Sequence, residues 1–202
     1  MDGSKSQSLI GKYVNLPETQ TISSLKELKI KAPLVMKIIS PEITHKTEIG
    51  GVIVVHHKED IERSFDELIL NSKKNKIKLK GILVQEFVEG QQFIIGLKKD
   101  ETFGHVILFG AGGILTEILD DISIRKCPIN ASEADDMIKE LKSRKLFEGF
   151  RNIKLNKDLL KHHLVEVSKI PQKHKDIIEL DINPYILNSK EGKAVDVRIV
   201  LN

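Results

Sequence analysis

Segments with the pattern of β-strands outnumber helical segments in this chain, and several follow one another after only a short turn. The segments that predict strands are rich in Ile, Leu and Val and span residues 34–39, 52–55, 81–88, 93–98, 105–109, 177–187 and 193–200. Helical spacing of apolar residues extends over three longer stretches, 58–71, 134–141 and 160–167. A short turn joins antiparallel neighbours, whereas parallel strands need a long crossover connection. The sequence therefore predicts an α+β fold with mostly antiparallel sheets.

Composition narrows the class of protein. The chain has 202 residues, of which 40% are hydrophobic, so we expect a packed core in one large domain or two small lobes. The formal charge of +3 predicts neither a nucleic-acid nor a membrane partner. Cys127 is the single cysteine, which excludes an intrachain disulfide and favours a cytoplasmic protein. No apolar run has the length of a membrane span or a signal peptide.

Lys37 lies in a predicted strand between aliphatic neighbours on the same face. Strand side chains alternate, so Val35, Lys37 and Ile39 point the same way. A buried ammonium group is costly unless an anion pairs with it. Two interpretations remain: the amine reaches water along a sheet edge, or it is held against a phosphate as a point charge.

The last two predicted strands form a hairpin with a polar face. A turn centred near residues 189–190 places Asn183 opposite Asp196, and directly opposed residues have Cβ atoms about 5 Å apart. An amide oxygen and a carboxylate at that separation can share Mg²⁺, which takes one or two protein oxygens and completes its shell with water and phosphate. The alternative is a solvated polar face, which is common on antiparallel hairpins.

Glycines and one strand end are further candidates for nucleotide contacts. Gly50 and Gly51 precede a strand, and residues 110–113 follow another, so backbone N–H groups there could approach phosphate. Glycine also serves turn geometry, and this pattern alone does not separate the two uses. Residues 85–88 end an apolar strand at the expected junction of two lobes, where backbone groups could meet a purine edge; an ordinary strand end is the alternative.

Taken together, these motifs resemble the ATP-grasp β subunit of ADP-forming acyl-CoA synthetases. The matching stretches lie in the family's order, at residues 34–52, 83–88, 109–125, 179–184 and Asp196. The resemblance implies an ATP-grasp fold with lobes at residues 9–84 and 85–202 that hold ATP or ADP with Mg²⁺, after a disordered N-terminus at residues 1–8. It also implies conversion of acyl-CoA, ADP and phosphate to an acid, CoA and ATP.

The resemblance further implies a hetero-oligomer. A CoA-binding α subunit or domain would form an acyl phosphate, and a phosphohistidine would carry the phosphoryl group towards the nucleotide. Lys37 would contact the nucleotide phosphates, Gly50 and Gly51 would cover them, and Glu86 and Val88 would meet the adenine.

Other residues match the metal site and the mobile loops of the family. Asn183 and Asp196 match the Mg²⁺ ligands. His45 matches a loop histidine proposed as a second phosphoryl carrier, which would divide one long transfer into shorter steps. Glu117 and Arg125 match a second loop and are candidate catalytic residues, with Arg125 able to neutralise charge on the transferring group.

Gln92 departs from the family's pattern. Many members hold the ribose hydroxyls with an acidic residue near this position, and an amide supplies the hydrogen bond without the charge. This departure supports an alternative, a non-catalytic ATP-grasp module that binds nucleotide without phosphorylation of His45. Another ATP-grasp ligase, such as a succinate–CoA ligase subunit or a carboxylate–amine ligase, is a third hypothesis.

Overall fold

The computed structural model describes residues 3–40, 49–112 and 120–202, which fall into two compact units. Unit 1 comprises Met1–Leu16 and Val88–Asn202, and unit 2 comprises Pro17–Phe87. Each unit contains one sheet, and every strand pairing in the described part of the chain is antiparallel. The predicted α+β class is therefore confirmed. No helix among the described residues is long and apolar enough to cross a membrane.

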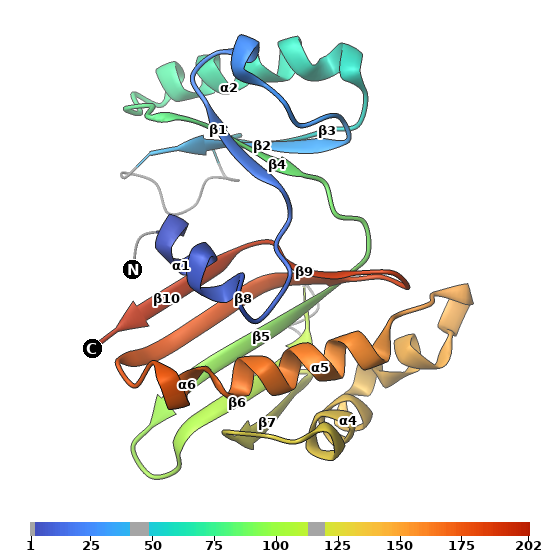
Figure 1. Cartoon of the computed structure of the whole chain (residues 1–202). Coiled ribbons are helices and arrows are strands. Elements are labelled where there is room, and N and C mark those ends of the chain that lie inside the picture. The colour runs from blue at the N-terminus through green and yellow to red at the C-terminus, as the bar shows by residue number, and fades with distance from the viewer. Residues whose placement is uncertain (1–2, 41–48, 113–119) are drawn as a thin grey trace. The chain divides into compact units, whose positions relative to one another are not determined.

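Unit 2 is a four-stranded sheet covered by one long helix (Figure 1). Its strands are β1 (Thr19–Ile22), β2 (Leu34–Ile39), β3 (Val52–Val55) and β4 (Gly81–Glu86), in the order β1-β4-β2-β3. Its helices are the short η1 (Leu25–Glu27) and η2 (Lys58–Asp60), followed by α2 (Ile61–Lys74). Alternate residues of β2 are buried in a core that includes Phe65 and Leu68 of α2.

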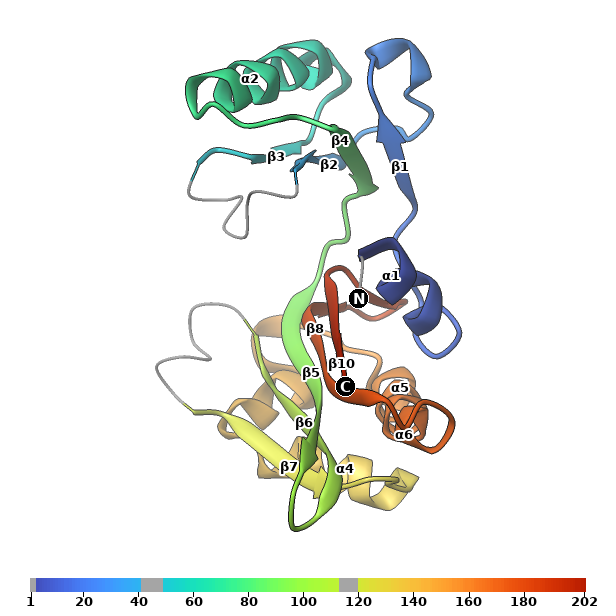
Figure 2. The same cartoon turned by 90° about the vertical axis from the view of Figure 1, so that its left-hand side faces the viewer.

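Unit 1 is built on a six-stranded sheet in the order β10-β8-β5-β6-β7, with β9 paired to β8. The strands are β5 (Gln91–Asp100), β6 (Gly104–Ala111), β7 (Ile122–Lys126), β8 (Ile177–Leu187), β9 (Gly192–Ala194) and β10 (Val197–Leu201). The helices are α1 (Gly3–Ile10), α4 (Ala131–Glu140), η3 (Lys142–Glu148), η4 (Phe150–Asn152), α5 (Lys157–Ser168) and α6 (Ile170–Lys173). Apolar residues of α4 and α5 share one core with the inner face of the sheet (Figure 2).

The beginning of the chain differs from the sequence-based expectation. Residues Gly3–Ile10 form α1 instead of a disordered segment, and Ile10 and Val14 are fully buried in the core of unit 1. Residues 9–16 therefore belong with unit 1 and not with the lobe expected at residues 9–84. The boundary at which the chain returns to unit 1 lies after Phe87 instead of after residue 84. The residues of α1 are mostly small and polar, so the sequence shows no helical pattern there. The helix is stabilised by tertiary burial of a few apolar side chains.

A buried histidine and tyrosine link α5 to β8. His163 Nδ1 and Tyr185 Oη are hydrogen-bonded at 2.8 Å, and the rings meet edge to face. Only 3% of His163 and none of Tyr185 is exposed. Burial, followed by the nearby His162, lowers the pKa of His163 to about 4, and burial raises the pKa of Tyr185. His163 is therefore neutral in the fold at physiological pH.

This lowered pKa predicts a loss of stability in acid. The unfolded chain binds a proton on this imidazole near pH 6.5, whereas the folded chain binds it only near pH 4. The contribution is therefore complete above pH 6.5 and falls by about 3 kcal/mol as the pH drops to 4, at about 1.4 kcal/mol per pKa unit. Urea unfolding of the wild-type chain and of His163→Gln at several pH values would measure it. The variant should lose this part of the pH dependence, and parallel curves would contradict the prediction.

Candidate functional site

The C-terminal strands bring Asn183 and Asp196 together. The register of β10 on β8 runs from Val200 opposite Glu179 to Val197 opposite Ile182, and β9 continues it with Ala194 opposite Tyr185. The backbone N–H of Asn183 donates to the carbonyl oxygen of Asp196 at 3.1 Å. The predicted pairing of these two residues is therefore confirmed, and both side chains are exposed.

β8 is irregular at this point. On the β5 side, Tyr185 pairs with Phe93 and Ile182 pairs with Ile95, so two residues of β8 stand opposite one residue of β5. Such a bulge changes the direction of a side chain relative to simple alternation. As a result, Tyr185 points into the core like Ile182, three residues earlier. Asn183 follows simple alternation and shares the opposite face with Asp181.

The chemistry of this face suits a hard cation. Burial raises the pKa of Asp181, and the negative charges of Glu179 and Asp196 raise it further, against the opposing effect of Arg198. A bound cation would relieve this repulsion. Within the described residues no group of three or more His, Cys, Asp or Glu side chains could hold a metal ion. Two protein oxygens, from Asn183 and Asp196, fit Mg²⁺ that completes its shell with water and phosphate.

A hollow of about 510 Å³ lies beside Asn183 on the same face. Apolar side chains of β5, β6 and β7 line it, and Ile122 and Ile124 are 42% and 49% exposed. Its polar lining residues are Lys98, Asp120, Glu179, Asp181 and Asn183. An apolar surface with a few polar groups at one side is typical of a small-molecule site.

In unit 2, Lys37 is held by a buried amide. Its Nζ donates to Oε1 of Gln85 at 2.8 Å, and Gln85 is fully buried. The face that carries Lys37, Val35 and Ile39 is half-buried, because the alternate residues of β2 fill the core. The expected burial of Lys37 is therefore only partial. Sequence reasoning missed Gln85, although its alternation with Leu83 placed it on the same face as Lys37.

Gly50 and Gly51 lie beside Lys37 in the sheet. The carbonyl oxygen of Gly51 accepts from the N–H of Ile38 at 2.9 Å, and Lys37 pairs with the next residue, Val52. Gly50 has a φ of +65°, and its carbonyl oxygen accepts from Nδ2 of Asn71 at 2.9 Å. This positive φ favours glycine, and a Cβ on Gly50 would lie 2.7 Å from that nitrogen and displace the Asn71 side chain. The structure thus brings these three candidate residues together.

Glu86 and Val88 lie on either side of the point where the chain passes between units. The Glu86 carboxylate accepts from the backbone N–H of Glu18 at 3.0 Å, and the Glu86 N–H donates to the Glu18 carbonyl at 2.9 Å. Val88 is 5% exposed. The Glu86 side chain therefore ties β4 to the residue before β1, and the adenine contact expected of this segment rests on backbone groups and stays a prediction.

Gln92 is exposed at the start of β5, and glycines crowd against its backbone. Its carbonyl oxygen accepts from the N–H of Gly112 at 2.8 Å, and a Cβ on Gly112 would lie 2.7 Å from the Gln92 carbonyl carbon. A Cβ on Gly110 would lie 2.7 Å from the carbonyl oxygen of Asp121. Close backbone packing therefore explains both glycines, which leaves their expected approach to phosphate as a prediction.

Arg125 does not line the hollow. In β7, Ile122 and Ile124 line the hollow, whereas Ser123 is buried on the opposite face and Arg125 forms an ion pair with Glu140 of α4. Ser123 Oγ also donates to Glu140 at 2.6 Å. The hydrogen bond to Glu140 raises the pKa of Arg125. This arrangement makes Arg125 a link between β7 and α4, and the catalytic role expected of it stays a prediction.

His45 and Glu117 lie outside the described residues, and the catalytic roles expected of them stay predictions. Asp121, four residues after Glu117, is 2% exposed, and its side chain caps the start of η3. Its two carboxylate oxygens accept from the backbone N–H groups of Lys142 and Ser143 at 2.5 and 2.9 Å. No local pattern in the sequence predicts this contact, because its partners lie 21 and 22 residues away in the chain.

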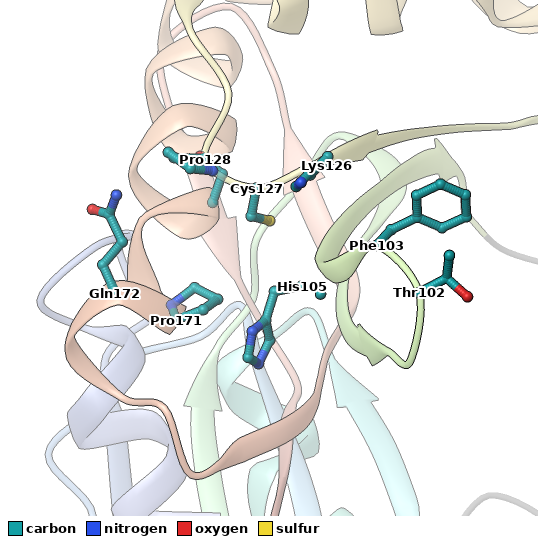
Figure 3. A pocket seen from close by; sticks show the side chains of 10 residues that line it. Thr102, Phe103, His105, Lys126, Cys127, Pro128, Pro171 and Gln172 are labelled. Atoms are coloured by element: carbon teal, nitrogen blue, oxygen red, sulfur yellow. The ribbon is translucent and has the colours of Figure 1, made fainter.

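A second hollow of about 480 Å³ surrounds Cys127 at the opposite end of β5 from Gln92 (Figure 3). Burial raises the pKa of the Cys127 thiol to about 12, so it stays protonated at neutral pH. His105 is hydrogen-bonded through Nε2 to the carbonyl oxygen of Ile177 at 2.7 Å. The raised pKa argues against a nucleophilic role for Cys127, because a thiol needs a lowered pKa to act as a nucleophile.

The contacts of Asp121 generate a stability prediction. Asp121→Asn should lower the free energy of unfolding by about 1–3 kcal/mol, since the NH₂ of the buried amide would face one of the two N–H donors. Urea denaturation at neutral pH would measure the loss. Asp136→Asn, on the exposed side of α4, is the control and should stay within about 0.5 kcal/mol of the wild type. Equal stability of the two variants would contradict the prediction.

Comparisons with known proteins bear on both units. A family model described as an ATP-grasp domain matches residues 3–201. The chain is 35% identical to the beta subunit of acetate–CoA ligase [ADP-forming] I of Pyrococcus furiosus, over 86% of this chain and 77% of that protein. It is also 35% identical to acetate–CoA ligase [ADP-forming] I of Archaeoglobus fulgidus, over 93% of this chain and 27% of that protein. The chain thus spans about a quarter of the length of this longer relative.

Solved structures give a similar result. The dinucleotide-forming acetyl-coenzyme A synthetase 1 of Ca. Korarchaeum cryptofilum, in complex with coenzyme A, Ca-AMPCP and HgCl⁺, superposes with a TM-score of 0.90 at 35% identity. The match covers 98% of this chain and 92% of that chain. A second structure of that protein, with coenzyme A and Mg-AMPPCP and a phosphohistidine segment pointing towards the nucleotide-binding site, gives a TM-score of 0.86 at 33% identity.

Proposed function

We propose, from the premise that this chain belongs to the ATP-grasp domain family, that it is the nucleotide-binding part of an ADP-forming acyl-CoA synthetase. The predicted ATP-grasp fold is confirmed by the family match and by the structural likeness. In the proposed reaction, acyl-CoA, ADP and phosphate give a free acid, CoA and ATP. The beta subunit from Pyrococcus furiosus, most of whose length this chain matches, supports this division of the enzyme.

The opposed pair Asn183 and Asp196 carries the proposal. The two residues would hold Mg²⁺ on a face where acidic charges already repel one another. When bound, the ion would neutralise charge on the nucleotide phosphates. Backbone groups at Glu86 and Val88 would meet the adenine. Lys37, fixed by Gln85, would add a positive charge for a phosphate oxygen, and Gln92 would hydrogen-bond the ribose hydroxyls.

A histidine relay would deliver the phosphoryl group. We propose that His45 receives it from the partner and passes it to ADP, so that the N–P bond breaks as a bond forms from phosphorus to a terminal oxygen of ADP. The CoA-binding partner, an α subunit or a domain, would form the acyl phosphate in the cytoplasm. The acid and CoA would bind mostly to that partner, so the partner would select the acid. Relatives of this chain include enzymes named for different acids, such as the 4-hydroxybutyrate–CoA ligase of Nitrosopumilus maritimus, which is 39% identical.

Gln92 supports a second candidate function. An uncharged residue at the ribose position suits a module that binds nucleotide for regulation and transfers no phosphoryl group. The two functions differ in one observable, which is phosphorylation of His45 in the presence of the partner and acyl-CoA.

Mg²⁺ binding is the first test. Asp196→Asn and Asn183→Ala should each weaken binding of ADP in the presence of Mg²⁺ by at least about tenfold, because each removes one of two protein ligands. ADP binding without Mg²⁺ should change little. Calorimetric titration with and without the metal would separate the two effects. Asp158→Asn, an exposed carboxylate on α5, is the matched control and should bind as the wild type. Equal Mg²⁺ dependence in all four proteins would contradict the assignment.

Turnover is the second test. The chain with its CoA-binding partner should make ATP from acetyl-CoA, ADP and phosphate. His45→Ala should abolish this turnover while leaving Mg·ADP binding intact, since the relay is broken and the nucleotide contacts remain. His57→Ala, an exposed histidine on the same unit, is the control. Unchanged turnover in His45→Ala would remove that residue from the mechanism, and turnover by this chain alone would contradict the need for a partner.

A further inference from the structure

The strand that carries Asn183 is anchored on its inner side by Tyr185. At the bulge, Asn183 and Pro184 stand opposite a single residue of β5, and Tyr185 then enters the core. On the returning strand, Val195 donates its N–H to the Pro184 carbonyl at 3.0 Å, beside the bond between Asn183 and Asp196. Both candidate metal ligands therefore lie in one kink of the ribbon, and Tyr185 is the first core residue after it.

The hydroxyl of Tyr185 reaches across the ribbon to α5. It is hydrogen-bonded to His163 Nδ1 at 2.8 Å in a fully buried position. The path of this hydroxyl passes over Gly192 of β9, where any Cβ would collide with Tyr185 Oη. Gly192 therefore leaves room for the Tyr185 side chain, and His163 of α5 is the hydrogen-bond partner of its hydroxyl.

We propose that the Tyr185–His163 hydrogen bond positions the kink so that Asn183 and Asp196 face the same cation. The bond fixes Tyr185 against α5, Tyr185 fixes the end of the bulge, and the bulge sets the position of Asn183 relative to Asp196. Tyr185 pairs with Ala194, two residues before Asp196, so the same anchor constrains the partner strand. Tyr185 and His163 are positioning residues, since neither points to the face that carries the metal ligands. The inference rests on the proposed function.

The test is calorimetric titration of the full chain with ADP, with and without Mg²⁺. Tyr185→Phe should reduce the strengthening of ADP binding by Mg²⁺ about fivefold, the effect expected from losing one buried hydrogen bond. ADP binding without Mg²⁺ should stay the same. Ser168→Ala is the matched control, because its buried hydroxyl on α5 accepts from Ile129 N–H at 3.0 Å far from the ribbon. It should lower thermal stability without changing the Mg²⁺ effect.

A double variant separates positioning from simple destabilisation. Tyr185→Phe leaves the His163 nitrogen buried and unpaired, whereas Tyr185→Phe with His163→Leu removes both polar groups and should regain stability. If positioning is correct, the double variant still shows the reduced Mg²⁺ effect. A normal Mg²⁺ effect in either variant would overturn the inference. A wild-type chain whose ADP affinity does not respond to Mg²⁺ would instead overturn the proposed function, and the inference with it.

Discussion

The backbone bond between Asn183 and Asp196 is the interaction on which the candidate site depends. β8 is the longest strand of unit 1 and pairs with β5, β9 and β10, so its register fixes where every polar side chain of that sheet emerges. A slip of β8 by one residue would turn Asn183 to the other face and away from Asp196. The buried residues on either side of the kink, Ile182 and Tyr185, hold that register through the core.

The candidate site residues of the two units carry charges of opposite sign. On the sheet of unit 1, acidic groups gather around a shallow hollow, and burial together with their mutual repulsion raises the pKa of Asp181. In unit 2 the important charge is a single ammonium, and the buried amide of Gln85 fixes Lys37 without neutralising it. In the proposed function, a metal ion in unit 1 and Lys37 in unit 2 would each meet negative charge, which a nucleoside diphosphate carries on its phosphates.

Local patterns in the sequence predicted most of the strands, the α+β class and the pairing of Asn183 with Asp196, because alternation and turn position are local properties. They missed β1 (Thr19–Ile22) and β7 (Ile122–Lys126). The bulge, the burial of Tyr185 and the helix at the N-terminus depend on contacts between distant segments and could not be predicted in this way. The ion pair of Arg125 with Glu140 shows the same limit, because the packing of α4 against β7 joins distant segments. Alternation placed Gln85 on the face of Leu83, but its contact with Lys37 also needs the register of β4 on β2.

Crystals of the chain grown with Mn²⁺ and ADP would test the central claim most directly, because manganese can replace magnesium and gives an anomalous signal. We expect one strong peak between Asn183 Oδ1 and the Asp196 carboxylate, about 2.0–2.2 Å from each oxygen, with the remaining ligands from phosphate and water. A nucleotide bound with its metal elsewhere, or bound with no metal near these two residues, would contradict the assignment of this ribbon as the metal site.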